Sequence, residues 1–348
     1  MSTTETNQST VNKEKIGRQI RPEKGSAIFE VDDLHLHYLT RFGQKIHSVS
    51  GVSFTMGQGE VLGIAGESGC GKSTLVNGCM GLIIPPLFPT SGDVRVAGES
   101  IMNRSAKDIR KNVLSRKVAM IPQGAFNSLN PTRKIKDLAA DVVSDHENNS
   151  NRKEIYQRLR DRFQLIGMDA DYVLNSYPIQ LTAGMRQRSV IGISTLLNPK
   201  VVIADEPTSA LDVSTQKQVI KMIFDLLEKK IFSSMIFITH ELPLLRHVAD
   251  RIAIMYAGEF VEVGTTEQIV FDPRHPYTQA LMGAMLSADS NQKDKKPVAI
   301  EGAPPNLAKP IEGCRFAERC PQARPVCKER KQEIRIVAER QVRCEYAS

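Results

Sequence analysis

Residues 66–74 have the spacing G-x-x-x-x-G-K-[ST], which is typical of a loop that binds phosphates. Its glycines let the backbone curve around a polyphosphate with the N–H groups pointing inward. We expect Lys72 to reach the β- and γ-phosphates and the Ser73 hydroxyl to bind Mg²⁺. A glycine turn with a chance Lys-Ser pair is the alternative. The residues expected to bind nucleotide are Gly66, Ser68, Gly69, Cys70, Gly71, Lys72, Ser73 and Thr74.

Two carboxylates end another apolar run, at residues 201–206. Asp205 at the end of a buried strand is suited to hold Mg²⁺ through water. Glu206 is then the general base for a water that attacks the γ-phosphate. Gln123 and His240 also follow apolar runs, so we expect both to contact the ligand. A solvated Asp-Glu pair and a structural histidine are the alternatives.

These side chains require a sheet whose strands end at one edge. Apolar runs that alternate with helical patterns predict a mainly parallel sheet with its ligand at the carboxyl edge. Shorter alternating runs at 29–64 predict an antiparallel N-terminal sheet, in which Tyr38 either stacks on a base or is simply half-buried. Apolar residues at helical spacing predict a helical insertion at about 132–190. The fold class is therefore α/β.

The composition is that of a soluble protein, with 41% hydrophobic and 24% charged residues. The uncharged stretch 77–92 contains three prolines and predicts no membrane span. Residues 1–26 are polar and lack an apolar segment, which predicts a disordered tail and no signal peptide. We therefore expect a cytosolic chain whose six cysteines are thiols or metal ligands.

The motifs resemble, in type and order, the ATP-binding subunit of ABC transporters over about residues 29–265. The resemblance implies a P-loop ABC nucleotide-binding domain that hydrolyses ATP with Mg²⁺. It implies a head-to-tail dimer in which the signature helix of one subunit covers ATP held by the other. It also implies that Tyr38 stacks on the base, that Gln123 links Mg²⁺ and the attacking water to the membrane subunits, and that His240 contacts the γ-phosphate. The partner's nucleotide is contacted by Thr182, Ala183, Gly184 and Asp212.

The signature departs from the family pattern at one position. The usual Leu-Ser-Gly-Gly reads Leu-Thr-Ala-Gly at 181–184. The methyl group of Ala183 stands where the backbone must approach a phosphate, so we expect a site closed by this signature to hydrolyse ATP poorly. This predicts a heterodimer with a second ABC ATPase.

Motifs near the C-terminus indicate one branch of this family. Residues 275–281, with 313–316, 319–321 and 344–346, resemble the C-terminal region of dipeptide, oligopeptide and nickel importer ATPases. This implies two integral membrane permease subunits, an extracytoplasmic substrate-binding protein, and a peripheral position at the cytoplasmic face of the membrane. Peptides are the expected cargo, with nickel, glutathione or oligosaccharides as alternatives. A soluble ABC-type ATPase and a metal- or redox-sensing regulator are alternatives of other classes.

Four cysteines predict a small Cys-rich domain within a C-terminal region at 266–348, after an ATPase domain at 27–265. They are Cys314, Cys320, Cys327 and Cys344. The absence of a C-x₂₋₄-C pair disfavours zinc, and a proline directly after Cys320 is typical of [4Fe–4S] ligation. Zinc and unrelated thiols stay as alternatives. The nearby positive charges Arg315, Arg319, Arg324, Lys328 and Arg343 would offset a cluster, so we expect no nucleic-acid partner. Cys70 is expected to make the ATPase sensitive to alkylation or oxidation.

Overall fold

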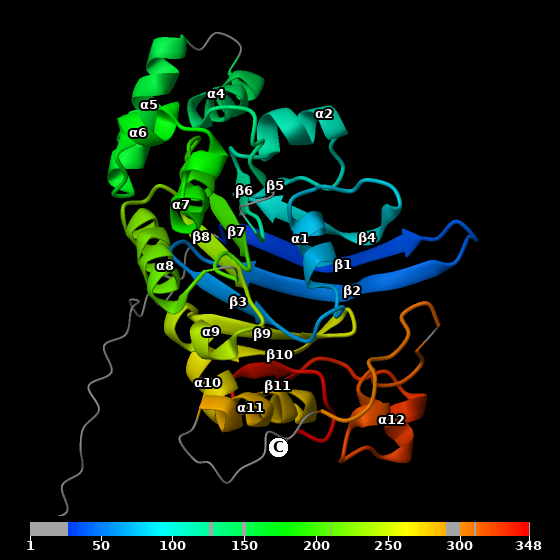
Figure 1. Ribbon diagram of the computed structural model, residues 1–348. Coiled ribbons are helices and arrows are strands. Elements are labelled where there is room, and N and C mark those ends of the chain that lie inside the picture. The colour runs from blue at the N-terminus through cyan, green and yellow to red at the C-terminus, as the bar shows by residue number, and fades with distance from the viewer. Residues whose placement is uncertain are drawn as a thin grey trace, which may run out of the picture.

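The computed structural model describes residues 27–124, 128–147, 151–209, 211–289, 300–309 and 311–347. The predicted tail at 1–26 lies outside these ranges. The described strands form a four-stranded sheet and an eight-stranded sheet, with helices around them (Figure 1). No helix in the described ranges has both the length and the apolar character needed to cross a membrane.

The smaller sheet is antiparallel, with the order β2-β1-β4-β5, and confirms the predicted N-terminal sheet. Its strands are β1 (Phe29–Leu39), β2 (Lys45–Met56), β4 (Leu87–Val96) and β5 (Glu99–Ser100). The strand β4 contains Pro89 and was not predicted. Since β5 pairs only with Arg95 and Val96, the rest of β4 lies at the sheet edge, where proline is tolerated.

The larger sheet has the order β11-β12-β10-β9-β3-β8-β7-β6, and its strands from β9 to β6 are parallel. They are β3 (Val61–Ala65), β6 (Val118–Ile121), β7 (Val201–Asp205), β8 (Ser234–Ile238) and β9 (Arg251–Tyr256). Every residue of β3, β7 and β8 is buried, as expected for parallel strands covered on both faces. The carboxyl ends of β6, β7, β8 and β3 therefore lie side by side.

Successive side chains of β3 pack into two different cores. Val61 and Ala65 join the core that the helices cover, whereas Leu62 and Ile64 join the core beneath the antiparallel sheet. The helices on and around the large sheet are α1 (Lys72–Cys79), α8 (Val213–Glu228), α9 (Leu242–Val248), α10 (Thr266–Phe271) and α11 (Pro276–Asp289). The loop after β3 thus leaves a strand that is fixed on both faces.

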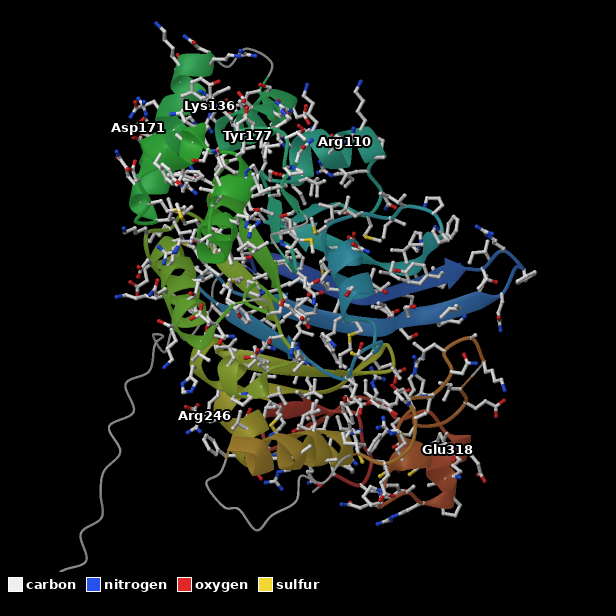
Figure 2. All side chains as sticks on the ribbon, viewed as in Figure 1. Arg110, Lys136, Asp171, Tyr177, Arg246 and Glu318 are labelled. Atoms are coloured by element: carbon white, nitrogen blue, oxygen red, sulfur yellow. The ribbon has the colours of Figure 1, made fainter. Side chains whose placement is uncertain are left out.

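A group of helices projects from one end of the molecule (Figure 1). It contains α4 (Ile135–His146), α5 (Arg152–Leu165), α6 (Ala170–Asn175), η2 (Pro178–Gln180) and α7 (Ala183–Ser194). The short α2 (Ala106–Asp108) and η1 (Ile109–Val113) precede β6. Figure 2 labels Tyr177 in this group, at the opposite end of the molecule from Glu318 in the C-terminal region. The exact domain limits stay predictions.

The C-terminal region is built into the large sheet. β12 (Arg340–Val342) pairs with β10 (Glu259–Thr265), and β11 (Arg335–Val337) pairs with β12. The remaining elements are η3 (Ala317–Arg319) and α12 (Pro325–Glu329). Phe316 joins the same core as Tyr277. The prediction of a separate small Cys-rich domain is therefore not supported, because its strands and its largest apolar side chain belong to the ATPase sheet and core.

Candidate functional site

The phosphate loop joins β3 to α1 and packs closely against other backbone segments. A Cβ atom on Gly66 would lie 2.1 Å from the carbonyl oxygen of Met255, and one on Gly71 would lie 2.2 Å from that of Ser48. Gly71 also has φ +109°, a conformation that other residues rarely adopt. Glycine is therefore required at both positions by close approach as well as by loop shape.

Lys72, the cation of the phosphate loop, contacts the backbone of the loop. Lys72 Nζ donates hydrogen bonds to the carbonyl oxygens of Gly66 at 2.7 Å and Glu67 at 2.9 Å. Ser68 and Ser73 are exposed, so their hydroxyl groups are open to a ligand. This arrangement fits the predicted contacts with phosphate and Mg²⁺.

The structure brings Tyr38 next to the phosphate loop although Tyr38 lies 28 positions before Gly66 in the sequence. Thr74 Oγ1, on the first turn of α1, donates to the Tyr38 hydroxyl at 3.3 Å. Base stacking by Tyr38 stays a prediction, but its hydroxyl group contacts the first turn of the helix that follows the loop.

Three predicted catalytic residues form one hydrogen-bonded group at the ends of β6, β7 and β8. Gln123 Nε2 donates to Glu206 Oε2 at 2.8 Å, and His240 Nδ1 lies 2.9 Å from Glu206 Oε1. Glu206 has φ +45°, which a glutamate seldom adopts, and its N–H donates to the carbonyl oxygen of Ile238 at 2.9 Å. The group therefore holds one carboxylate in a defined orientation, as a general base requires.

Asp205 is the buried carboxylate beside this group. Burial and the neighbouring charge of Glu206 raise its pKa, while Lys72 acts in the opposite direction. The raised pKa means that the positive charges of the protein alone do not fully stabilise the ionised Asp205 carboxylate. A divalent cation would supply that charge, so Asp205 fits its predicted role near Mg²⁺.

The signature and the loop before α8 are ordered by their own helices. Thr182 caps α7 by accepting from Met185 N at 3.3 Å, and Asp212 caps α8 by accepting from Ser214 N and Thr215 N at 3.0 Å. Among the hydrogen bonds of the described residues, none joins Thr182 or Asp212 to the phosphate loop. Ala183 is the first residue of α7. The roles of these residues at a partner's nucleotide stay predictions.

The four C-terminal cysteines line a single cavity together with His275 and Phe316. All four are free thiols, and burial raises the pKa of Cys314 to about 11. Across the described part of the chain, no three Cys, His, Asp or Glu side chains form a group that can hold a metal ion. The fold therefore collects the four thiols, but a metal centre is not supported.

The positively charged side chains near the four cysteines contact other groups of the protein. Arg315 lies 3.3 Å and Arg343 3.8 Å from carboxylate oxygens of Glu259, and Lys328 lies 3.1 Å from Glu318. Arg319 pairs with Glu67 at 2.7 Å, and Arg324 lies over the ring of Tyr346. Four of these five cations therefore already contact protein carboxylates, so their presence does not by itself support a cluster.

Cys70 does not have the environment of a reactive thiol. Its side chain is buried, and burial raises its pKa despite the nearby Lys72 ammonium. Since the thiolate is the reactive form, the expected sensitivity to alkylation through Cys70 is not supported.

Sequence reasoning missed two residues that contact the phosphate loop from the C-terminal region. The Tyr277 hydroxyl accepts a hydrogen bond from Glu67 N at 3.0 Å, and Arg319 binds the Glu67 carboxylate. These residues lie 210 and 252 positions from Glu67, so no local pattern marks them.

Two protein-family descriptions match the chain. "ABC transporter" matches residues 49–209, and "Oligopeptide/dipeptide transporter, C-terminal region" matches residues 261–327. The cassette named MJ0796, a bacterial ABC transporter cassette solved as a dimer, superposes with a TM-score of 0.59 at 22% identity, and the alignment covers 68% of this chain and 98% of that one. The structural likeness supports the fold.

Curated relatives are more similar in sequence. The dipeptide transport ATP-binding protein DppD of Caldanaerobacter subterraneus subsp. tengcongensis is 37% identical over 320 residues, which is 92% of this chain and 97% of that protein. The oligopeptide transport ATP-binding protein OppD of Bacillus subtilis is 40% identical over 294 residues, which is 84% of this chain and 81% of that protein. Taken with the phosphate loop and the group around Glu206, these matches show that the chain belongs to the family of ATP-hydrolysing subunits of dipeptide and oligopeptide ABC transporters.

Proposed function

We propose that this chain hydrolyses ATP to drive import of dipeptides or oligopeptides through separate membrane subunits. The observation that carries the proposal is the hydrogen-bonded group of Gln123, Glu206 and His240 beside the phosphate loop. The names of the relatives support peptides as the cargo.

The proposed chemistry follows from the placement of each group. Lys72 and the loop N–H groups bind the β- and γ-phosphates of ATP. Glu206 accepts a proton from the attacking water, and His240 and Gln123 orient its carboxylate. Mg²⁺, when bound, supplies positive charge at the phosphates. The Ser73 hydroxyl, the Asp205 carboxylate and the Gln123 amide oxygen would hold it, since the Gln123 nitrogen is already used as a donor.

The proposed partners are two membrane permease subunits and an extracytoplasmic substrate-binding protein, which would place the chain at the cytoplasmic face of a membrane. The test is uptake of labelled dipeptide by cells that lack the chromosomal copy. Wild-type chain should restore uptake, whereas Lys72→Ala should not. Restored growth on nickel or restored oligosaccharide uptake without restored peptide uptake would contradict the cargo assignment.

We also propose that the working dimer contains a second, related ATPase. Ala183 supports this, because its methyl group begins the signature helix where a glycine backbone would approach the partner's phosphate. In the purified complex, Glu206→Gln should abolish most turnover, while the matching change in the second ATPase should matter much less. Equal losses, or a complex with two copies of this chain and no second ATPase, would contradict the asymmetry.

A [4Fe–4S] cluster at the four cysteines stays our proposal for the C-terminal cavity, because all four thiols line it. Anaerobically purified protein should contain iron and acid-labile sulfide in near equal amounts. Cys314→Ser should lose both, whereas the control Cys79→Ser in α1 should keep them. Stoichiometric zinc without sulfide, or no metal at all, would refute the cluster.

A further inference from the structure

The one acidic side chain of the phosphate loop is bound by the C-terminal region. Arg319 Nη1 and Nη2 lie 2.7 and 2.9 Å from the two carboxylate oxygens of Glu67, in a bidentate pair. The Arg319 side chain is 4% exposed and that of Glu67 is 25% exposed. Such a fork, largely removed from water, is stronger and more directional than a surface ion pair.

The guanidinium is fixed before it meets the loop. Arg319 Nε donates to the carbonyl oxygen of Glu301 at 2.9 Å, Nη2 donates to that of Ile300 at 3.1 Å, and Nη1 donates to the Tyr256 hydroxyl at 3.2 Å. Each of the three nitrogens therefore has a partner outside the loop. The position of Arg319 is set by the C-terminal region and β9, so it can impose a position on Glu67.

The same loop residue is held through its backbone. The Tyr277 hydroxyl, in a fully buried side chain, accepts from Glu67 N at 3.0 Å, and the Glu67 carbonyl oxygen accepts from Lys72 Nζ at 2.9 Å. The Tyr277 ring packs edge-on against Phe316, with ring centroids 5.3 Å apart. The C-terminal region is therefore one residue away from the phosphate-binding ammonium.

We propose that Arg319 is a positioning residue for the ATP site: it neutralises Glu67 and holds the phosphate loop in its binding shape. A free carboxylate at Glu67 would repel the triphosphate that the loop binds, because both carry negative charge in a partly dehydrated site. The proposal does not depend on which group, if any, occupies the cysteine cavity. It makes the C-terminal region part of the nucleotide site.

The test compares Arg319→Gln, Glu67→Gln and the double variant by Mg-ATP titration of the full chain. Arg319→Gln should raise the Kd about tenfold, which is within the coupling expected for one hydrogen-bonded network. Glu67→Gln should change the Kd by less than about threefold, and the double variant should recover most of the affinity, because the repelling charge is gone. The control is Arg330→Gln, which breaks an exposed C-terminal pair with Glu345 and should leave the Kd unchanged.

A purely structural role would give a different pattern. It would lower the melting temperature of Arg319→Gln without raising the Kd, or leave the double variant as weak as the single one; either result overturns the proposal. In steady-state assays Arg319→Gln should raise KM for ATP more than it lowers kcat, since the group around Glu206 is untouched. If Arg319→Gln does not fold, Arg319→Lys decides: it keeps the charge that neutralises Glu67, so its Kd should stay within about threefold of wild type, and a tenfold rise would refute charge neutralisation as the cause.

Discussion

Replacing Glu206 with Gln removes the proposed general base while changing little else. The side chain keeps its size, and its 17% exposure means that both carboxylate oxygens rely mainly on Gln123 and His240. An amide can accept from only one of these donors through its oxygen. The other contact persists if the Gln123 amide turns over or the His240 ring offers Nδ1 as an acceptor. The expected cost in stability is therefore no more than one hydrogen bond, about 1 kcal/mol.

The effect on hydrolysis should be much larger than the effect on folding. An amide cannot take a proton from water, and a positioned general base contributes about 10²- to 10⁴-fold to a rate. The Kd for Mg-ATP should stay unchanged or become smaller, because the substitution removes one negative charge and leaves the loop contacts of Lys72 intact. The predicted signature is a large loss in kcat with no loss in nucleotide affinity.

The assay measures phosphate release and Mg-ATP binding on the same preparation, with thermal unfolding as a control for folding. His240→Ala provides the comparison: it removes one contact that orients Glu206 but keeps the base, so its kcat should lie between those of wild type and Glu206→Gln. If Glu206→Gln keeps more than about a tenth of the wild-type rate, the rate has fallen by less than the range expected for the loss of a general base. The assignment of Glu206 would then be wrong. A loss of binding that parallels the loss of rate would show that Glu206 holds the nucleotide instead.

Three further predictions concern the loop, the buried acid and the signature. Lys72→Ala should raise the Kd for ATP by at least about tenfold, because it deletes a charged contact with phosphate; an unchanged Kd in nucleotide titration would contradict this role. Asp205→Asn should raise the melting temperature of nucleotide-free protein near pH 8, because burial raises the pKa of Asp205 and its charged form destabilises the fold above that pKa. This gain should vanish near pH 3, where the carboxyl is neutral in both the folded and unfolded states, and a gain independent of pH would refute the explanation. Gly184→Ala should destabilise the protein by about 1–3 kcal/mol in denaturant unfolding, because the new Cβ would lie 2.8 Å from Thr215 Cγ2.

The ATP site was largely predictable because its motifs combine local chemistry with a strong strand signal. The run 61–65 followed by Gly66 requires a strand and a turn, and the structure has β3 and the loop there. The ends of the apolar runs 118–121, 201–205 and 235–238 meet because neighbouring parallel strands end at one edge. This topological rule brings Gln123 and His240 to Glu206 without any knowledge of the distances between them.

The parts that were not predictable depend on pairings between distant segments. The strand β12 joins β10 through a register that no turn sequence specifies, so a Cys-rich tail looked like a domain of its own. The arginines around the cysteines looked like counter-charges for a cluster because their acidic partners, Glu259 and Glu67, lie far away in sequence. Charge counts along a sequence cannot distinguish these two situations.

The C-terminal region supplies contacts to residues of the ATPase core, and its removal would leave those residues without them. Without Tyr277 and Phe316, the Tyr256 ring, 4.5 and 5.2 Å from theirs, would lose its packing directly behind the phosphate loop. Without Arg319, the loop would carry an unpaired carboxylate, and without β12 the buried Glu262 of β10 would lose the Arg340 guanidinium 3.7 Å away. The last two losses each take the facing cation from a carboxylate that is wholly or partly buried, which costs more than losing an exposed ion pair. Changes in the tail should therefore be felt at the nucleotide site even where they touch no ATP-binding residue.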